Sequence, residues 1–527
     1  MFGSRYAQRA KTVEARQTSA AGYGGGEPAQ PDGEILRALQ ARFRHTFRET
    51  FSDPNAPRTV VIVPSLSLDR EVLARISGVH HYEERMLCLL LLLRQPRTRI
   101  VYLTSRPIPE PIIDYYLHLL PGIPVQHARP RLTLLSCHDG SPVALTAKVL
   151  CRPRLLQRVR EAIPDLSTAH MTCFNVTELE RTLAVRLGLP IYGCDPALLH
   201  WGSKSGSRKI FREAGIALPE GSEDLSATAY FVEALAELKA RRPKIRKAVV
   251  KLNEGFSGEG NAIFDYQGAP EGAGLSHWIQ DRLPHLAFEA KDMTWDLYEE
   301  KLAGMGGIVE EFIEGAVKRS PSTQFRVDPT GQVEPVSTHD QLLGGRSGQI
   351  FLGCRFPADD SYRLQIQESG FRAAHVLADK GVLGRFAIDF LSVRDGNEWR
   401  HFAIEINLRK GGTTHPFLML QFLTDGCYDP QTGSFLTPAG QPRCYYASDN
   451  LEAEHYKGLT PSDLIDIAAL NGLHFNGACQ EGVVFHLIGA LSEFGKLGVL
   501  CIGPSHDRAE ALYCRTTEIL DREGTAV

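Results

Sequence analysis

Two short runs in the second half of the chain, RFAIDFL at 385–391 and HFAIEINL at 401–408, alternate apolar and polar side chains. A period of two is that of a β-strand, whose successive side chains point to opposite faces. One face of the predicted hairpin carries the apolar side chains of Phe386, Ile388, Phe390, Phe402, Ile404 and Ile406. The other face carries the polar side chains of Asp389, Glu405, Asn407 and Arg409. Packing both apolar faces together fixes the parity of pairing, so we expect a loop with an odd number of residues, centred near Asn397.

This register places Asp389 opposite Glu405 or one pair away. Two carboxylates in that position repel each other, and a cation between them removes the conflict. The all-oxygen set of Asp389, Glu405 and Asn407 suits Mg²⁺, which takes a few carboxylates together with substrate phosphates. This pattern therefore indicates a Mg²⁺ site here. The alternative is a solvated sheet face whose charges are left to water.

A glycine-rich loop lies about 130 residues earlier, in AVVKLNEGFSGEGNAIF at 248–264. Its order is GxxGxG, and a β-rich run follows it, so it fits neither the dinucleotide fingerprint GxGxxG nor a Walker A loop. Glycine between two strands lets backbone N–H groups turn toward an anion. The alternative is an ordinary hairpin turn. With Lys251 before it and the acidic hairpin after it, the loop supplies the parts needed to hold Mg-ATP.

A third element is GGIVEEFIEG at 306–315, which we expect to be a strand ending in acids. A strand with free backbone N–H and C=O groups can recognise the edge of adenine. The alternative is a plain strand that ends in a turn at Gly315.

The chain divides into four expected parts, with an α/β fold class overall. Residues 1–32 lack an apolar stretch and are expected to be disordered. From residue 58, strands and helices alternate, which predicts a Rossmann-like domain with a parallel sheet at 33–195. Residues 196–450 form an α+β part with lobes at 196–305 and 306–450, and 451–527 form a small C-terminal α/β domain.

Composition excludes several classes of protein. The net charge of −4 gives no general attraction to nucleic acid or to an anionic membrane. The eleven cysteines form no CxxC pair, which favours reduced thiols in a cytoplasm over a disulfide framework or a zinc site. The longest apolar run, Met86–Leu93, is far shorter than a membrane span and predicts a buried helix. We expect a cytoplasmic protein without nucleic-acid or membrane partners; a homo-oligomer is left open.

Five segments in this order resemble the ATP-grasp superfamily over about 196–420: GSKSGSRKIFREAGIALPE, VVKLNEGFSGEG, IVEEFIEG, RFAIDF and AIEINLRKGG. Further segments, SPSTQFRV, STHDQLLGG, LGCRFPA and EINLRKGGTTHP, are similar to the pheganomycin-type peptide ligases. The resemblance implies a pre-ATP-grasp domain, an ATP-grasp fold and a small C-terminal domain.

The resemblance also implies roles for individual residues. ATP would be bound by Lys204, Lys251, Glu254, Phe256, Ser257, Gly258, Glu310, Glu311 and Ile313. The metal ligands would be Asp389, Glu405 and Asn407, holding one or two Mg²⁺ ions. Arg409 would neutralise the γ-phosphate and the acyl-phosphate, with Arg326 and His415 as further catalytic candidates. Substrate would contact Arg326, Arg346, Arg409 and Thr414. For Arg326 and Arg346 the alternative is a surface arginine, and for His415 a structural histidine.

The implied reaction is the joining of a small carboxylic acid to an amine or peptide, with ATP converted to ADP and phosphate through an acyl-phosphate. Two other functions stay open. One is a different ATP-grasp enzyme, such as a biotin-dependent carboxylase, although no biotin-carrier motif like AMKM is present. The other is a nucleotide-binding regulatory protein without catalysis.

Overall fold

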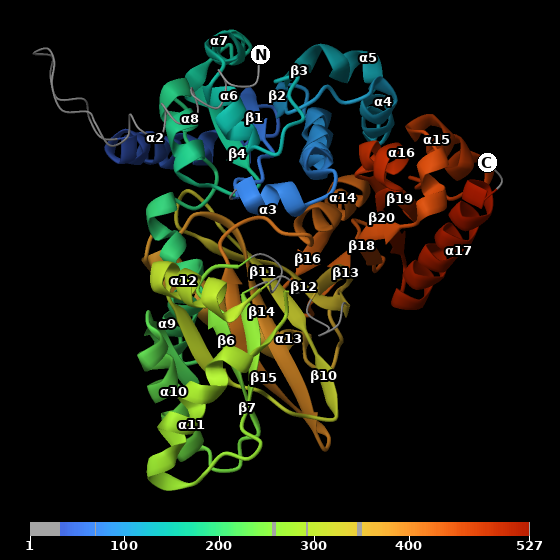
Figure 1. The fold of residues 1–527 in the computed structure, drawn as a ribbon. Coiled ribbons are helices and arrows are strands. Elements are labelled where there is room, and N and C mark those ends of the chain that lie inside the picture. The colour runs from blue at the N-terminus through green and yellow to red at the C-terminus, as the bar shows by residue number, and fades with distance from the viewer. Residues whose placement is uncertain (1–31, 69, 256–259, 291–292, 345–349, 526–527) are drawn as a thin grey trace, which may run out of the picture.

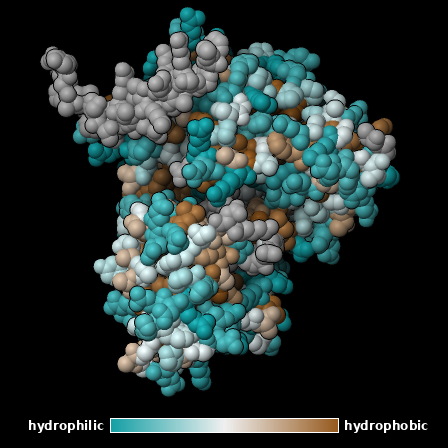
Figure 2. Space-filling model, viewed as in Figure 1, coloured by the Kyte–Doolittle hydropathy of each residue, from teal (hydrophilic) through white to brown (hydrophobic). Residues whose placement is uncertain are grey.

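The computed structural model describes residues 32–68, 70–255, 260–290, 293–344 and 350–525. An α/β domain forms the upper part of the molecule, two lobes lie below it, and the C-terminal segment lies to one side (Figure 1). Hydrophobic side chains gather in the hollow between the upper domain and the lobes, whereas the outer surface is mostly hydrophilic (Figure 2). Among the described residues, no helix combines the length and apolar character needed to cross a membrane.

The N-terminal domain has a four-stranded parallel sheet in the order β3-β2-β1-β4, as the alternating pattern predicts. Its strands are β1 (Arg58–Val63), β2 (Thr98–Thr104), β3 (Leu132–Ser136) and β4 (Ala169–Cys173). Its helices are α2 (Asp32–Ser52), α3 (Arg70–Arg75), η1 (Val79–Arg94), α4 (Glu110–His118), α5 (Val125–Ala128), η2 (Arg129–Arg131), α6 (Leu145–Leu150), α7 (Pro153–Glu161), η3 (Leu166–Thr168) and α8 (Glu178–Leu187). Beyond α8, a single parallel bridge joins Ile191 to Met171 of β4.

The apolar run Met86–Leu93 lies in η1, a 3-10 helix that is buried over most of its length. One apolar core continues from β1, β2 and η1 into α14, β18, β19 and β20, elements that lie more than 300 residues later. Burial of apolar surface therefore joins the N-terminal domain to the C-terminal segment.

The first lobe contains a five-stranded antiparallel sheet in the order β5-β9-β6-β7-β8. Its elements are η4 (Pro196–Gly202), α9 (Lys204–Glu213), β5 (Gly221–Leu225), α10 (Thr228–Arg241), β6 (Lys247–Leu252), β7 (Asn261–Asp265), η5 (Gly272–Gly274), α11 (Leu275–Arg282), η6 (Leu283–His285), β8 (Ala287–Phe288), α12 (Trp295–Met305) and β9 (Gly307–Glu311). Because β9 pairs with β5 and β6, the expected lobe boundary at 305 falls before the last strand of this sheet.

The second lobe and the C-terminal segment share one nine-stranded sheet in the order β10-β14-β11-β12-β13-β18-β20-β19, with β15 paired to β14. The second lobe contains β10 (Val317–Arg319), β11 (Pro321–Val327), β12 (Val333–Gly344), β13 (Ile350–Phe356), α13 (Arg363–Asp379), β14 (Gly384–Asp395), β15 (Glu398–Asn407), α14 (Thr414–Thr424), β16 (Cys427–Asp429), β17 (Ser434–Leu436) and β18 (Cys444–Glu452). The C-terminal segment adds η7 (Glu454–Gly458), α15 (Pro461–Leu470), β19 (Gly482–His486), η8 (Ile488–Ala490), α16 (Leu491–Phe494), β20 (Lys496–Gly503) and α17 (His506–Thr525). The expected boundary at 450 therefore falls inside β18, which pairs with β20.

The β14–β15 hairpin pairs Asp389 directly with Glu405, one of the two arrangements that the alternation allows, but the connection differs from the prediction. The prediction of an odd loop is wrong: Asp395 pairs with Glu398 across a two-residue turn. A bulge restores the parity, since Phe390 pairs with Ala403 while Asp389 pairs with Glu405. An extra residue on one strand shifts the phase of its side chains. Ala403 therefore enters the core, and the expected core residues Phe402 and Ile404 are only partly buried.

Helix α13 lies so close to β11 that Gly370 has no room for a side chain. A methyl group there would lie 2.6 Å from Thr323 Oγ1 and 2.7 Å from a ring carbon of Phe325. We expect Gly370→Ala to lower the free energy of unfolding by about 1–3 kcal/mol. Gly304→Ala, at a helical glycine with open space around it, should raise it by up to about 1 kcal/mol. Urea denaturation of both variants measures this, and equal effects would contradict the close packing.

Candidate active site

The cross-strand pair of Asp389 and Glu405 is the centre of the candidate site. Asn407 joins them, because its Nδ2 lies 3.0 Å from Asp389 Oδ2 and 3.2 Å from Glu405 Oε1. Gln341 Nε2 donates to the other Asp389 oxygen at 2.9 Å. The three predicted metal ligands are thus in contact with one another, on the face of the hairpin opposite the core.

The two carboxyl groups differ in their tendency to ionise. Burial and the neighbouring Glu405 raise the pKa of Asp389 to about 7. Burial alone would raise the pKa of Glu405 too, but the Lys204 ammonium overrides it and lowers that pKa to about 2. Two half-buried carboxylates in contact are both charged more readily beside a further cation. The oxygen donors and this unmet charge fit a hard divalent cation such as Mg²⁺.

Lys204 comes from the first lobe and forms an ion pair with Glu405 of the second. It is the first residue of α9, whose N-cap Ser203 accepts a hydrogen bond from Gly206 N at 3.0 Å. Asn253 ties this helix start to the end of β6: its backbone oxygen accepts from Lys204 N at 3.1 Å and its Oδ1 from Ser205 N at 2.9 Å. The sequence prediction did not include Asn253.

Lys251 and Glu310 form a buried ion pair between β6 and β9. Arg208 adds a second cation, since its Nη1 lies 3.2 Å from Glu310 Oε2. Lys251 also lies close enough to Glu405 to lower the pKa of that carboxyl. Lys204 and Lys251 of the first lobe therefore both lie near Glu405 of the acidic hairpin. The structure thus brings the two lysines predicted to bind ATP close to the predicted metal ligands.

The expected adenine strand ends at Glu311, and its residues have different surroundings. The Glu311 carboxylate accepts from Glu220 N at 3.0 Å and lies 3.2 Å from Arg242. Within the described part of the chain, the backbone N–H of Ile313 donates no hydrogen bond, while its carbonyl accepts from Lys318. The Ile313 N–H is thus available to a ligand.

Four predicted site residues lie outside the described residues: Phe256, Ser257, Gly258 and Arg346. Glu254, at the start of the glycine-rich loop, is exposed.

Arg409 lies beside the acidic pair, and burial lowers the pKa of its guanidinium against the opposite effect of Glu405 and Asp389. The next residue, Lys410, crosses to the N-terminal domain, where its Nζ lies 2.6 Å from the Cys173 carbonyl oxygen. Thr414 closes the loop that follows, because its Oγ1 accepts from Gly411 N at 3.0 Å. The segment after the hairpin is therefore held against the strand ends of the N-terminal sheet.

Arg326 is not in contact with the acidic pair. It lies on β11, where its Nε donates to Glu334 Oε2 at 3.0 Å. Its strand neighbour Ser322, four residues away, is the residue that pairs with Asp389.

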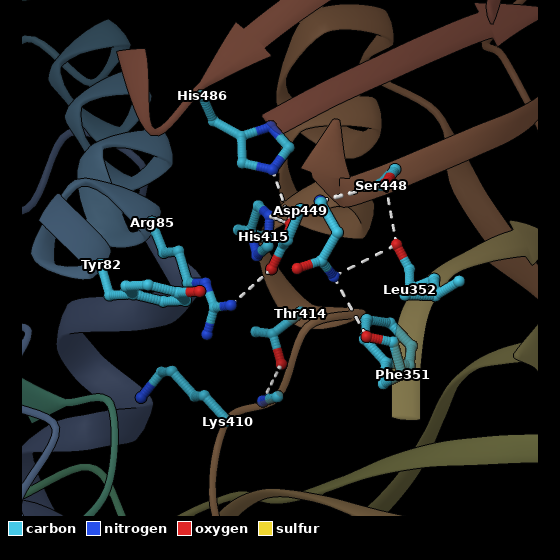
Figure 3. Close-up of polar contacts among 12 residues, drawn as sticks. Tyr82, Arg85, Phe351, Leu352, Lys410, Thr414, His415, Ser448, Asp449 and His486 are labelled. Atoms are coloured by element: carbon cyan, nitrogen blue, oxygen red, sulfur yellow. Dashed lines mark hydrogen bonds and ion pairs between the residues drawn. The ribbon is translucent and has the colours of Figure 1, made fainter. Parts of the chain in front are cut away.

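His415 belongs to a separate buried network at the start of α14 (Figure 3). Its Nε2 lies 3.1 Å from Asp449 Oδ1, and Nε2 of His486 lies 2.7 Å from the same oxygen. Arg85 Nη2, from η1, lies 2.7 Å from Asp449 Oδ2. Gly498 leaves the space that the His486 ring occupies, since a methyl group there would overlap it.

This network has the geometry of a hydrogen-bonded hub. The three ligand-type atoms of His415, Asp449 and His486 lie within 4.8 Å of one another. However, both imidazoles contact one Asp449 oxygen and a guanidinium contacts the other, so the carboxylate is already compensated. The sequence reasoning missed Arg85, Asp449 and His486 because residues so far apart carry no local pattern that relates them.

Comparisons with known proteins agree with this geometry. The chain matches the family profile "IQCH-like, ATP-grasp" over 196–270 and 273–431, and "PGM1 C-terminal domain" over 463–516. It is 30% identical to L-propargylglycine–L-glutamate ligase of Streptantibioticus cattleyicolor, over 91% of this chain and 97% of that protein. It is 21% identical to IQ motif-containing protein H of Danio rerio, over 90% of this chain and 49% of that protein.

Solved structures show the same fold at low sequence identity. A biotin carboxylase complex from Campylobacter jejuni has a TM-score of 0.51 at 13% identity, covering 86% of this chain and 89% of that one. N5-carboxyaminoimidazole ribonucleotide synthetase in complex with ADP has a TM-score of 0.50 at 13% identity, covering 88% and 98%. The architecture is thus the ATP-grasp fold, which confirms the predicted fold class.

With a 30% identical relative matched over nearly its whole length, the family is established as well. The chain belongs to the ATP-grasp family and is an ATP-dependent ligase, as the sequence resemblance predicted.

Burial lowers the pKa of His415 to about 4, from an ordinary value of 6.5. The free energy of unfolding therefore depends on pH through this residue. The unfolded chain then takes up a proton at a higher pH than the folded protein does. The contribution to stability is full above pH 6.5 and is lost as the pH falls through about 4. Other buried histidines also lose stability in this window, so we expect the wild type to lose roughly 3 kcal/mol more than His415→Gln across it. The exposed His277→Gln is the control, and parallel profiles for wild type and His415→Gln would contradict the assignment.

Proposed function

We propose that this ligase joins the carboxylate of one small substrate to the amine of another, at the expense of ATP. The supporting observation is the convergence of Asp389, Glu405 and Asn407 with Lys204 and Lys251 from the facing lobe. A carboxylate set, two lysines and a nearby arginine are the groups that phosphoryl transfer needs for charge stabilisation.

Mg²⁺ would be held by Asp389, Glu405 and Asn407. When bound, the cation neutralises charge on the phosphates of ATP and on the two carboxylates. Lys204 and Lys251 would bind the phosphates from the first lobe, and the N–H of Ile313 would donate to adenine. The loop residues Glu254, Phe256, Ser257 and Gly258 stay predicted phosphate contacts.

The chemistry has two balanced steps. A substrate carboxylate oxygen attacks the γ-phosphorus, the bond to the β–γ bridging oxygen breaks, and ADP leaves. The amine nitrogen then attacks the acyl carbon of the acyl-phosphate, inorganic phosphate leaves, and the nitrogen loses a proton. Arg409 would stabilise the charge of the phosphoryl group as it moves. Closure of the two lobes would keep water from the intermediate.

The relative's name suggests the substrate class, since that enzyme joins L-propargylglycine and L-glutamate. We propose amino acids or short peptides as both substrates here. Thr414 and Arg346 stay predicted substrate contacts, whereas the hydrogen bonds of His415 favour a structural role over contact with substrate.

Hydroxylamine tests the first step, because it captures an acyl-phosphate as a hydroxamate. Across a panel of amino acids, we expect hydroxamate to require ATP and Mg²⁺ but no amine substrate. Arg409→Ala should lower its rate by about 100-fold, the cost of removing a preorganised charge-stabilising group. The exposed Arg400→Ala on β15 should keep the wild-type rate. ATP binding without hydroxamate or ADP for any acid would favour the non-catalytic alternative, and ADP formed with bicarbonate alone would favour a carboxylase.

Metal binding is tested by Glu405→Gln, which keeps the shape of the side chain and removes its charge. We expect turnover to be lost and the Mg²⁺ concentration for half-maximal ATP binding to rise at least tenfold, while the fold persists. Glu398→Gln, at the exposed start of the same strand, is the matched control. Wild-type turnover of Glu405→Gln at equal Mg²⁺ would remove Glu405 from the metal site.

A further inference from the structure

A row of charged residues crosses the second-lobe sheet near the N-terminal domain. Arg385 of β14 pairs with Arg326 of β11, which pairs in turn with Glu334 of β12. Glu334 forms its ion pair with Arg326. Within the described ranges, the guanidinium of Arg385 makes no hydrogen bond or ion pair. Like charges directly opposite each other destabilise a sheet, and this row of two arginines and one glutamate carries an excess positive charge.

Arg385 lies on the catalytic face of the hairpin. It precedes Asp389 by four residues, so the two side chains point to the same face about 13 Å apart along the strand. The intervening Phe386 and Ile388 point the other way, into the core. Lys410, one residue beyond Arg409, lies near Arg385: burial, and then the charge of Arg385, lower the pKa of Lys410 to about 8. Arg385 also follows the point where β14 touches the N-terminal domain beside Tyr192, because a methyl group on Gly384 would lie 2.8 Å from Gly193 Cα.

Tyr192 supplies a second polar group without a partner. Its hydroxyl is buried and has no hydrogen bond among the described residues. The ring is held edge-on by Phe43 at 5.7 Å and Phe47 at 5.8 Å between ring centres. Burial raises the pKa of Tyr192 to about 12, against the opposite influence of the nearby Arg326 and Arg385. The hydroxyl is therefore a proton donor at neutral pH.

Arg385 is charged at neutral pH as well, although burial, and then Arg326, lower its pKa to about 10. The Arg385 guanidinium is half-buried and the Tyr192 hydroxyl is buried, and polar groups removed from water are stabilised by a hydrogen-bonding partner. One carboxylate satisfies both, because its two oxygens match the planar fork of a guanidinium and can accept from a phenol. A monoatomic anion, which has no second acceptor atom, would match the guanidinium fork and the phenol hydroxyl less well.

We propose that Arg385 and Tyr192 bind a carboxylate of the substrate that does not react, so that one of the two joined molecules carries a carboxylate besides the one activated at Arg409. This rests on the proposed ligase function. The carboxylate has two sources: a second carboxyl group on the acid substrate, or the α-carboxylate of an amino acid that supplies the amine. Both present the same chemistry to Arg385.

The first experiment needs no turnover and uses malonate as the probe, with ADP and Mg²⁺ present. We expect malonate to raise the melting temperature of the wild type, with an apparent Kd that weakens about 10- to 100-fold in Arg385→Gln and less in Tyr192→Phe. Arg394→Gln, on the exposed end of the same strand, should bind like the wild type. Tyr192→Phe loses only a hydroxyl, so it keeps the test valid if Arg385→Gln folds poorly. Equal affinity in all variants would overturn the site.

The second experiment identifies the source, using the acid and amine pair that gives the fastest ADP release in the amino-acid panel. In Arg385→Gln, KM for one of the two substrates should rise about 10- to 100-fold while KM for ATP stays unchanged. A rise for the acid assigns the carboxylate to the acid substrate, and a rise for the amine assigns it to the other. A rise in KM for ATP alone would overturn the proposal. If no pair turns over but malonate binding still depends on Arg385, the ligase proposal fails and the anion site stands.

Discussion

Two half-buried carboxylates, Asp389 and Glu405, face each other across β14 and β15, and a cation supplied from elsewhere favours the charged form of both. Lys204 from the first lobe meets part of that need through its ion pair with Glu405. Mg²⁺ and the phosphates of ATP would meet the rest, so nucleotide binding and the electrostatics of the hairpin depend on each other. The ion pair also fixes the position of one lobe relative to the other, because Lys204 of the first lobe compensates the charge of Glu405 of the second.

The N-terminal domain is fixed to this hairpin by polar contacts as well as by the shared apolar core. Lys410 reaches the carbonyl of Cys173 at the end of β4, and Arg85 of η1 reaches Asp449 of β18. Ligands of open α/β sheets bind beyond the carboxyl ends of the strands, which is where Lys410 enters. Removing Asp449 would leave Arg85 buried without compensation, a change that typically costs 3–5 kcal/mol. The N-terminal domain, the segment after the hairpin and β18 are thus held together by apolar burial and by polar contacts.

Local patterns predicted the parts of the site that lie on single strands. Alternation along 385–391 and 401–408 was enough to place Asp389 opposite Glu405 or one pair away, but the even turn and the bulge were not predictable, because an extra residue leaves no mark on composition. The pairing of β9 with β5 and β6, and of β18 with β20, is decided by contacts between distant segments. For the same reason the sequence did not predict the network around Asp449 or the position of Arg385 near Tyr192. Both bring together residues that are far apart in the chain, and no local pattern relates such residues. His415 was noticed for its place beside the hairpin, and the structure gives it hydrogen bonds that serve packing.

The central claim is that a substrate carboxylate is activated by transfer of the γ-phosphoryl group of ATP, beside Asp389, Glu405 and Arg409. Labelling both oxygens of the acid substrate with ¹⁸O tests this directly, with the released phosphate examined by ³¹P NMR. An acyl-phosphate passes one carboxylate oxygen to the phosphate when the amine displaces it. The account therefore predicts one ¹⁸O atom in each phosphate released, together with ADP. Unlabelled phosphate formed alongside the amide, or AMP and pyrophosphate in place of ADP and phosphate, would contradict it.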